Sequence, residues 1–168
     1  MLKKIAIIAL CVLPFGLFAQ EVKLGHINSS EVLVLLPEVA QMEKDIDALG
    51  KMWEDQLQKM QEEFNSKIAE YQKQQETMPE SIKQMRISEI QDLEQRIATF
   101  RQQAYADLQK KQQELIGPVI EKVKKAIGEV GAEGNFMYIF DTSTNSILYQ
   151  SPKAIDITEL VKKKLGIK

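Results

Sequence analysis

Residues 42–71 read MEKDIDALGKMWEDQLQKMQEEFNSKIAEY and carry an apolar side chain at every third or fourth position. This spacing places the apolar side chains on one face of an α-helix. Met42, Trp53 and Phe64 follow one another at equal steps of about three helical turns. A repeat of eleven residues over three turns corresponds to about 3.67 residues per turn. With this repeat the apolar stripe runs almost straight along the helix or drifts in a right-handed sense. The stretch therefore predicts one long helix with a single apolar stripe.

Residues 38–116, which surround this stretch, differ in composition from the rest of the chain. They hold 15 of the 17 glutamines, and Gly50 and Pro79 are their only glycine and proline. Because turn formers are so rare, we predict helices over about 38–77 and 80–116 that fold back on each other near residues 77–81. The second helix carries a less regular apolar stripe. We expect the two stripes to pack along a seam of Ile46, Leu49, Leu57, Met60, Phe64, Ile68, Ile90, Leu93, Ile97 and Phe100.

The segment before this hairpin predicts a strand and a short helix. Residues 22–28 alternate well enough to form one strand. Asn28 offers a side-chain oxygen that can cap a short helix, and Pro37 lies where that helix ends and the long one begins.

The segment after the hairpin predicts a further helix and two more strands. Gly117 and Pro118 are expected to interrupt the returning helix, because proline lacks the backbone N–H that a helix needs. Residues 135–141 and 146–150 predict a hairpin of two strands, and residues 156–165 a last helix.

The predicted fold class is α+β and mostly α, with a long antiparallel helical hairpin, residues 37–116, protruding from a small body. The body combines residues 20–36 with residues 117–168. At roughly 70 residues it is near the lower limit for a lone hydrophobic core, so we expect an oligomer. The core of the body or of the oligomer is expected to include Leu24, Ile27, Phe136, Tyr138, Phe140 and Leu148.

Residues 1–19 predict a secretory signal peptide. Lys3 and Lys4 precede an apolar run over residues 5–18, which is shorter than the ~20 residues that span a bilayer. Ala19 offers a small residue before a cleavage point, although an uncleaved N-terminal anchor stays an alternative. In a bacterium with two membranes, a cleaved signal peptide predicts a periplasmic protein.

The composition disfavours most enzymes and nucleic-acid-binding proteins. Cys11 falls within the predicted signal peptide, and His26 is the only histidine, so the usual disulfide and zinc clusters are excluded. A formal charge of −2 lacks the dense basic footprint that nucleic-acid binding needs. No phosphate-binding glycine loop and no set of nucleophile and base is found. We therefore predict no catalytic, cofactor-binding or metal-binding residues, and we interpret His26 as a packing or hydrogen-bonding residue.

Several motifs, in order along the chain, carry a resemblance to a known family. They are the opening strand with residues 25–29, Pro37, the glutamine-rich hairpin, Pro118 before residues 119–123, and the ending at residues 136–141, 148–149 and 156–161. Together they resemble the Skp/OmpH family of periplasmic chaperones over essentially the whole chain after the signal peptide.

The resemblance implies a homotrimer whose helical arms enclose a cavity and hold unfolded outer-membrane proteins without ATP. The charge of this sequence departs from that of the family's best-known members, which have basic arms and a proposed lipopolysaccharide site. Residues 38–116 contain 11 basic and 16 acidic side chains, a net charge of −5. Electrostatic capture of anionic lipid, lipopolysaccharide or acidic clients is therefore doubtful for this chain.

We predict that clients bind apolar, flexible side chains on the arm. Thioethers suit surfaces that accept many apolar partners. The predicted client-binding residues are Met52, Met78 and Met85, which lie off the seam stripe or near the tip, with Trp53 as either a seam or a client residue. The alternative function is that of a structural coiled-coil protein that spaces or tethers components of the cell envelope.

Overall fold

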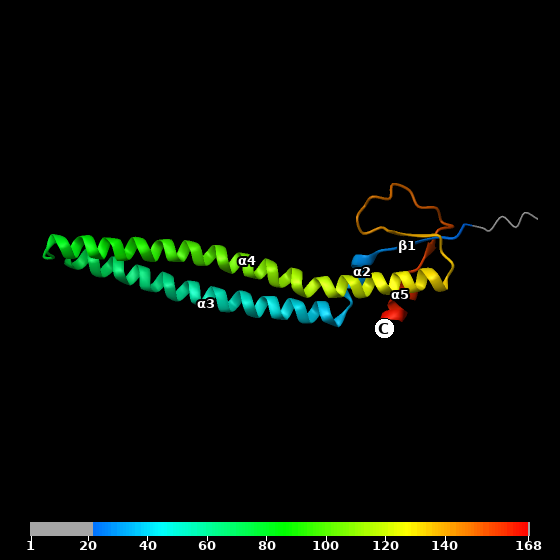
Figure 1. The fold of residues 1–168 in the computed structure, drawn as a ribbon, viewed down its shortest axis with the longest axis horizontal. Coiled ribbons are helices and arrows are strands. Elements are labelled where there is room, and N and C mark those ends of the chain that lie inside the picture. Colours follow the sequence, from blue (N-terminus) through cyan, green and yellow to red (C-terminus); the bar gives the residue numbers. More distant parts are fainter. Residues whose placement is uncertain (1–21, 168) are drawn as a thin grey trace, which may run out of the picture.

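The computed structural model describes residues 22–167, so the predicted signal peptide lies outside the described residues. Two long antiparallel helices dominate it: α3 (Pro37–Gln74) and α4 (Glu80–Glu133). Figure 1 shows them as a hairpin that extends to one side of a small sheet and two short helices. At about 1.5 Å per residue, the 38 residues of α3 span about 57 Å. The long helical hairpin predicted from the sequence is confirmed.

The hairpin begins and turns at prolines. Pro37 is the first residue of α3, where its missing N–H costs no helical hydrogen bond. The chain reverses between Gln74 and Glu80, and Pro79 directly precedes α4. At the other end, Lys122 of α4 donates a hydrogen bond to Glu38 in the first turn of α3. This ion pair joins the base of the hairpin and lowers the pKa of Glu38.

The predicted break at Gly117 and Pro118 is wrong, because α4 runs through both residues without interruption. The reason is the apolar face that continues past the proline. Val119, Val123 and Val130 keep the helical spacing, and all three are buried in the core of the body. Pro118 has no N–H and so cannot donate the backbone hydrogen bond of its position in the helix. Burial of the apolar face outweighs the loss of this one hydrogen bond.

The body contains a sheet of three parallel strands, β1 (Leu24–Ile27), β2 (Tyr138–Asp141) and β3 (Ile155–Asp156), in the order β2-β1-β3. The predicted hairpin of strands is therefore wrong. Within the described residues, 146–150 form no strand, and β2 pairs with β1 from the other end of the chain. Figure 1 shows the segment between β2 and β3 as a long loop, and its Gln150 lies 2.7 Å from His26 of β1.

One face of this sheet packs on the helices. Ile27 and the residues around it form a core with α2 (Ser29–Val34), the end of α4 and α5 (Thr158–Leu165). Ile139 lies on the same face, so close to Gly131 of α4 that a Cβ there would lie 3.0 Å from its Cδ1. The buried residues of this core are Ile27, Val32, Leu36, Val39, Val119, Val123, Ala126, Val130, Ile157 and Val161.

Asp141 at the end of β2 connects the sheet to α2. Its carboxylate accepts hydrogen bonds from the Ser29 hydroxyl at 2.5 Å and from the Ser143 backbone N–H at 2.9 Å. Partial burial alone would raise the pKa of Asp141, but these hydrogen bonds outweigh burial and lower it. The charged carboxylate therefore stabilises the junction between two segments that are distant in sequence.

Phe136 fills the space between β1 and the end of α4. A Cβ at Gly25 would lie 3.0 Å from the Phe136 ring, and one at Gly134 only 2.4 Å from it. The Lys23 ammonium lies 4.4 Å from the ring centroid and donates a hydrogen bond to the Gly134 carbonyl at 2.8 Å. Glycine at these two positions is thus required for the close approach of the aromatic ring.

Candidate functional site

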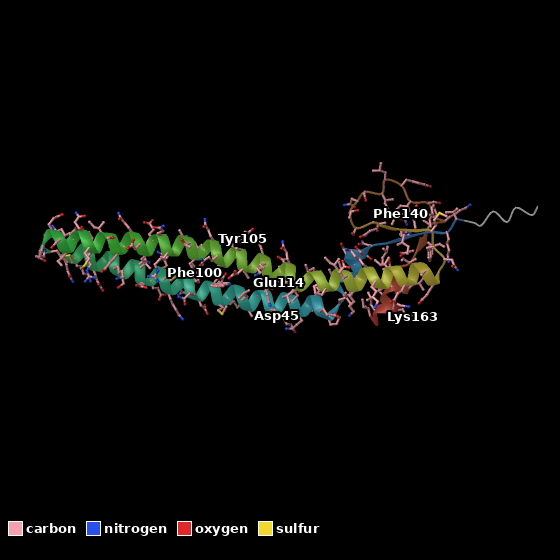
Figure 2. The ribbon with its side chains drawn as sticks, viewed as in Figure 1. Asp45, Phe100, Tyr105, Glu114, Phe140 and Lys163 are labelled. Carbon is pink, nitrogen blue, oxygen red and sulfur yellow. The ribbon has the colours of Figure 1, made fainter. Side chains whose placement is uncertain are left out.

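The seam between α3 and α4 places the predicted stripes against each other. Met60, Leu93 and Ile97 are buried at its centre, and Leu57, Phe64 and Phe100 pack around them. Figure 2 shows Phe100 along the line where the two helices meet. The remaining predicted seam residues are half-buried: Ile46, Leu49, Ile68 and Ile90.

Trp53 lies in this seam as well. Its ring meets the Phe100 ring edge to face, with centroids 5.1 Å apart. The indole Nε1 is buried without a hydrogen-bond partner, so the polar end of Trp53 points into the protein. Trp53 is half-buried and packs against Phe100 between the helices, and its role as a client contact stays a prediction.

An open groove of about 670 Å³ runs beside the centre of the seam. Met60 and Phe100 provide its apolar lining, and polar side chains from both helices surround them. We call it the central groove; its lining includes Gln56, Met60, Asp92, Arg96, Phe100 and Gln103.

A second, smaller cleft lies near the turn of the hairpin. Met78, Tyr71 and Ile90 line it together with charged residues. Glu89 accepts from Arg86 at 3.2 Å and from Lys67 at 3.5 Å, so the cations there already have an anionic partner. Desolvation would raise the pKa of Glu89, but these two cations outweigh it and lower the pKa. We call this the tip cleft.

Both openings lie on one face of the hairpin. An α-helix has about 3.6 residues per turn, so positions i and i+18 share a direction after about five turns. Gln56 lines the central groove, and Gln74, about five turns later on α3, lines the tip cleft. We call the side that carries both openings the groove face.

The exposed methionines of the hairpin lie on the groove face too. The same step of about five turns leads from Met52 to Glu70, which lines the tip cleft. It also leads from Met85 to Gln103, which lines the central groove. The side chains of Met52 and Met85 are 57% and 48% exposed. The structure thus brings the predicted residues Met52, Met78 and Met85 together on one face.

The glutamines of the groove face are a feature that the sequence analysis does not identify, since their abundance indicates only helix. Gln56 lines the central groove and Gln74 the tip cleft, and their spacing is the pattern from which their common side could have been found.

Tyr105 lies on α4 away from the groove face. It is 66% exposed, and its direction around the helix differs from that of Gln103 by about 200°.

The predicted core residues of the body separate into two groups. Ile27 is buried and Phe136 packs against the core. The others are exposed in the single chain: Leu24, Tyr138, Phe140 and Leu148. Leu148 is 100% exposed because its segment lies in the loop rather than in a strand, so it is no part of this chain's own core.

Leu24, Tyr138 and Phe140 form an open apolar face of the sheet. Leu24 pairs with Tyr138 and His26 with Phe140 in the register of β1 and β2, so these side chains share the side opposite Ile27. The rings of Tyr138 and Phe140 stack with centroids 6.0 Å apart. We call this the open sheet face, and Figure 2 shows Phe140 on it.

His26 lies at the centre of the open sheet face. Its Nε2 is 2.7 Å from Nε2 of Gln150 and 4.0 Å from Oδ2 of Asp156, while Nδ1 is buried without a partner. Asp156 also accepts from the Thr158 N–H at 2.8 Å, and its hydrogen bonds with Thr158 are the main reason that its pKa is lowered. In this chain His26 is held between a loop and β3.

Two features are absent from the described residues, 22–167. No three side chains of His, Cys, Asp or Glu there come close enough together to hold a metal ion. None of the helices in that range combines the length and apolar character needed to cross a membrane.

The chain matches a known protein family over nearly all of its described length. The family described as outer membrane protein (OmpH-like) matches residues 23–165, which include every helix and strand described above. None of the curated proteins matches the chain. Because the family match covers far more than half of the sequence, the chain belongs to the OmpH-like (Skp) family, whose members are non-enzymatic chaperones of the periplasm.

Proposed function

We propose that the chain is an ATP-independent holdase that binds unfolded outer-membrane proteins in the periplasm and prevents their aggregation. The observation that carries this proposal is the groove face. It combines an open groove lined by Met60 and Phe100 with the exposed side chains of Met52 and Met85. Export to the periplasm through cleavage of residues 1–19 is part of the same proposal.

The physical basis is a large number of weak and interchangeable contacts. Methionine side chains are flexible and adapt to partners of different shape. An unfolded β-barrel exposes apolar residues at many positions, so each segment of it finds some thioether or ring on the groove face. Because the central groove is open, no contact encloses the client tightly, and release needs no energy source.

Charge supports apolar contact as the main attraction. The arm region, residues 38–116, has a net charge of −5. On the groove face, Glu89 is paired with Lys67 and Arg86, which leaves little unpaired positive charge in the tip cleft. Binding of anionic lipid or lipopolysaccharide is therefore not part of the proposed function.

We further propose that three copies associate through the open sheet face and that their hairpins surround the client. Leu24, Tyr138 and Phe140 are exposed together in the single chain, which is costly for a protein in water. The number three follows from the family resemblance. We expect residues 20–168 to sediment as three chains, and a uniform monomer at micromolar concentration would contradict this part.

The function is tested by light scattering of an unfolded β-barrel protein diluted from denaturant. We expect the chaperone to suppress aggregation near a ratio of one trimer per client. Replacing Met52, Met78 and Met85 together by Ala should weaken suppression and leave the sedimentation unchanged. Tyr105→Ala, which removes an exposed side chain away from the groove face, is the matched control and should have no effect.

Two results would contradict the holdase. If the native protein does not change the aggregation of the client, the alternative of a structural spacer is favoured. If Tyr105→Ala weakens suppression as much as the triple variant does, clients do not select the groove face.

A further inference from the structure

We propose that Met52 and Met85 are oxidation sites through which peroxide or hypochlorous acid reversibly weakens client binding. The inference rests on the proposed function, because it concerns regulation of the groove face. It starts from the uneven exposure of the methionines. Met52 and Met85 are 57% and 48% exposed, whereas Met60 in the seam of the same hairpin is 8% exposed.

The rate of thioether oxidation follows the access of the oxidant to sulfur. Met52 lies in the middle of α3 and Met85 in the second turn of α4, and no described hydrogen bond or ion pair covers either side chain. The sequence contains no cysteine after Cys11, so no thiol of this chain from residue 20 onwards competes for oxidant. The two exposed methionines of the hairpin are therefore its most reactive sulfur atoms.

The chemical step is a transfer of one oxygen atom. A lone pair of the methionine sulfur attacks one peroxide oxygen, the S–O bond forms, the O–O bond breaks, and the remaining oxygen leaves as water after proton transfer. The sulfur is oxidised by two electrons and the peroxide is reduced to water. With hypochlorous acid the leaving group is chloride. The product is methionine sulfoxide, which is polar and can be reduced back enzymatically.

The consequence follows from the place of the two side chains. Both lie on the groove face, where the proposed attraction is apolar contact. A sulfoxide keeps the side chain's length but adds a polar S–O group, whose hydration is lost when an apolar client covers it. Since neither residue is buried in the seam, oxidation leaves the packing of Met60, Leu93 and Ile97 intact. The expected result is a folded chaperone that binds clients less tightly.

The first measurement is the order of oxidation. The folded native protein is treated with dilute hydrogen peroxide, and sulfoxide at each methionine is followed by peptide mass mapping. We expect Met52 and Met85 to be oxidised before Met60. Equal rates at all three positions, or faster reaction of Met60, would overturn the assignment.

The second measurement compares client binding before and after oxidation in the native protein and in the double variant Met52→Leu, Met85→Leu. Leucine keeps an apolar side chain of similar volume and cannot be oxidised. We expect about tenfold weaker binding of an unfolded β-barrel after oxidation of the native protein, equivalent to about 1.4 kcal/mol. At an oxidant dose that converts Met52 and Met85 of the native protein but leaves the half-buried Met78 intact, the double variant should bind equally well before and after. A methionine sulfoxide reductase with its thiol reductant should restore the native protein.

The outcomes distinguish this inference from the proposed function. If native protein with both sulfurs oxidised binds as before, or if the double variant loses the same affinity, the inference is wrong. If the untreated native protein does not bind the client at all, the proposed function itself fails.

Discussion

The hairpin and the body differ in how far apart in sequence their contacting residues lie. Across the hairpin, Lys67 pairs with Glu89 only 22 residues away. In the body, the Ser29 hydroxyl donates to Asp141, 112 residues away. Contacts between distant residues close long loops and form only when the separate segments of the body come together, whereas the hairpin closes around one turn. We therefore expect the body to unfold as one unit and the hairpin to loosen independently of it.

The largest expected effect is in the body. Ile27 of β1 is almost completely buried on the side of the sheet that packs against the helices. Ile27→Ala should therefore lower the free energy of unfolding by about 2–5 kcal/mol. Urea unfolding followed by circular dichroism measures it. Val34→Ala, on an exposed side chain of α2, is the control and should change stability by no more than about 0.5 kcal/mol. Equal effects of the two substitutions would refute the core described for the body.

The second effect is confined to the hairpin. Leu93 is buried in the seam, and Leu93→Ala should cost about 2–3 kcal/mol, towards the low end for such changes, because only two helices surround it. Hydrogen exchange should show faster exchange in residues 50–105 and unchanged protection in β1 and β2. If protection falls equally in the sheet, the two regions are not independent.

The third effect lies where the two regions join. Pro118 is exposed within α4, and alanine there would supply the N–H that the carbonyl of Glu114 lacks. Pro118→Ala should therefore raise the free energy of unfolding by about 1–2 kcal/mol. A loss of stability would mean that the proline serves the geometry at the base of the hairpin.

The fourth effect depends on pH and acts in the body. Asp141 has a lowered pKa in the folded state, so its carboxylate stabilises the protein above the ordinary aspartate pKa. That contribution is lost as the pH falls through the lower folded-state value. Asp141→Asn should cost about 1 kcal/mol at neutral pH and little below both pKa values. Urea midpoints at several pH values measure this, and a cost that does not depend on pH would contradict it.

The smallest expected effect is that of salt on client binding. Apolar contact is not screened by ions, whereas attractions between surface charges are. Client affinity should therefore change little between low salt and about 0.5 M sodium chloride. A steep fall, found by titrating a labelled client, would show that local charge clusters on the hairpin hold clients.

This difference in sequence separation also explains which elements are predictable from the sequence. The helix that carries Met42, Trp53 and Phe64 is predictable because its apolar residues recur every three or four positions, a pattern that is visible within a short stretch of sequence. The pairing of β1 with β2 leaves no such local pattern. Residues 146–150 contain the short apolar run Ile147, Leu148 and Tyr149, which favours a strand, although they lie in a loop. The wrong prediction at Pro118 has a related cause, since the buried face that keeps α4 intact is formed by partners distant in sequence.

The candidate site is predictable in part. Met52 and Met85 can be placed off the seam by counting along one helix. That they share a face with both openings depends on how α3 and α4 are rotated against each other, which the spacing within one helix does not determine. The sequence leaves the role of Trp53 open, and in the structure its ring meets the Phe100 ring edge to face.

The central claim, that clients bind the groove face, is tested most directly by labelling two neighbouring positions of α4. The chain from residue 20 onwards has no cysteine, so Gln103→Cys and Tyr105→Cys can each be made as a single thiol. Gln103 lines the central groove, and Tyr105 lies about 200° away around the same helix. Bound unfolded β-barrel protein should slow maleimide labelling at position 103 and leave position 105 unchanged. Equal protection of both positions, or protection of 105 alone, would contradict the account.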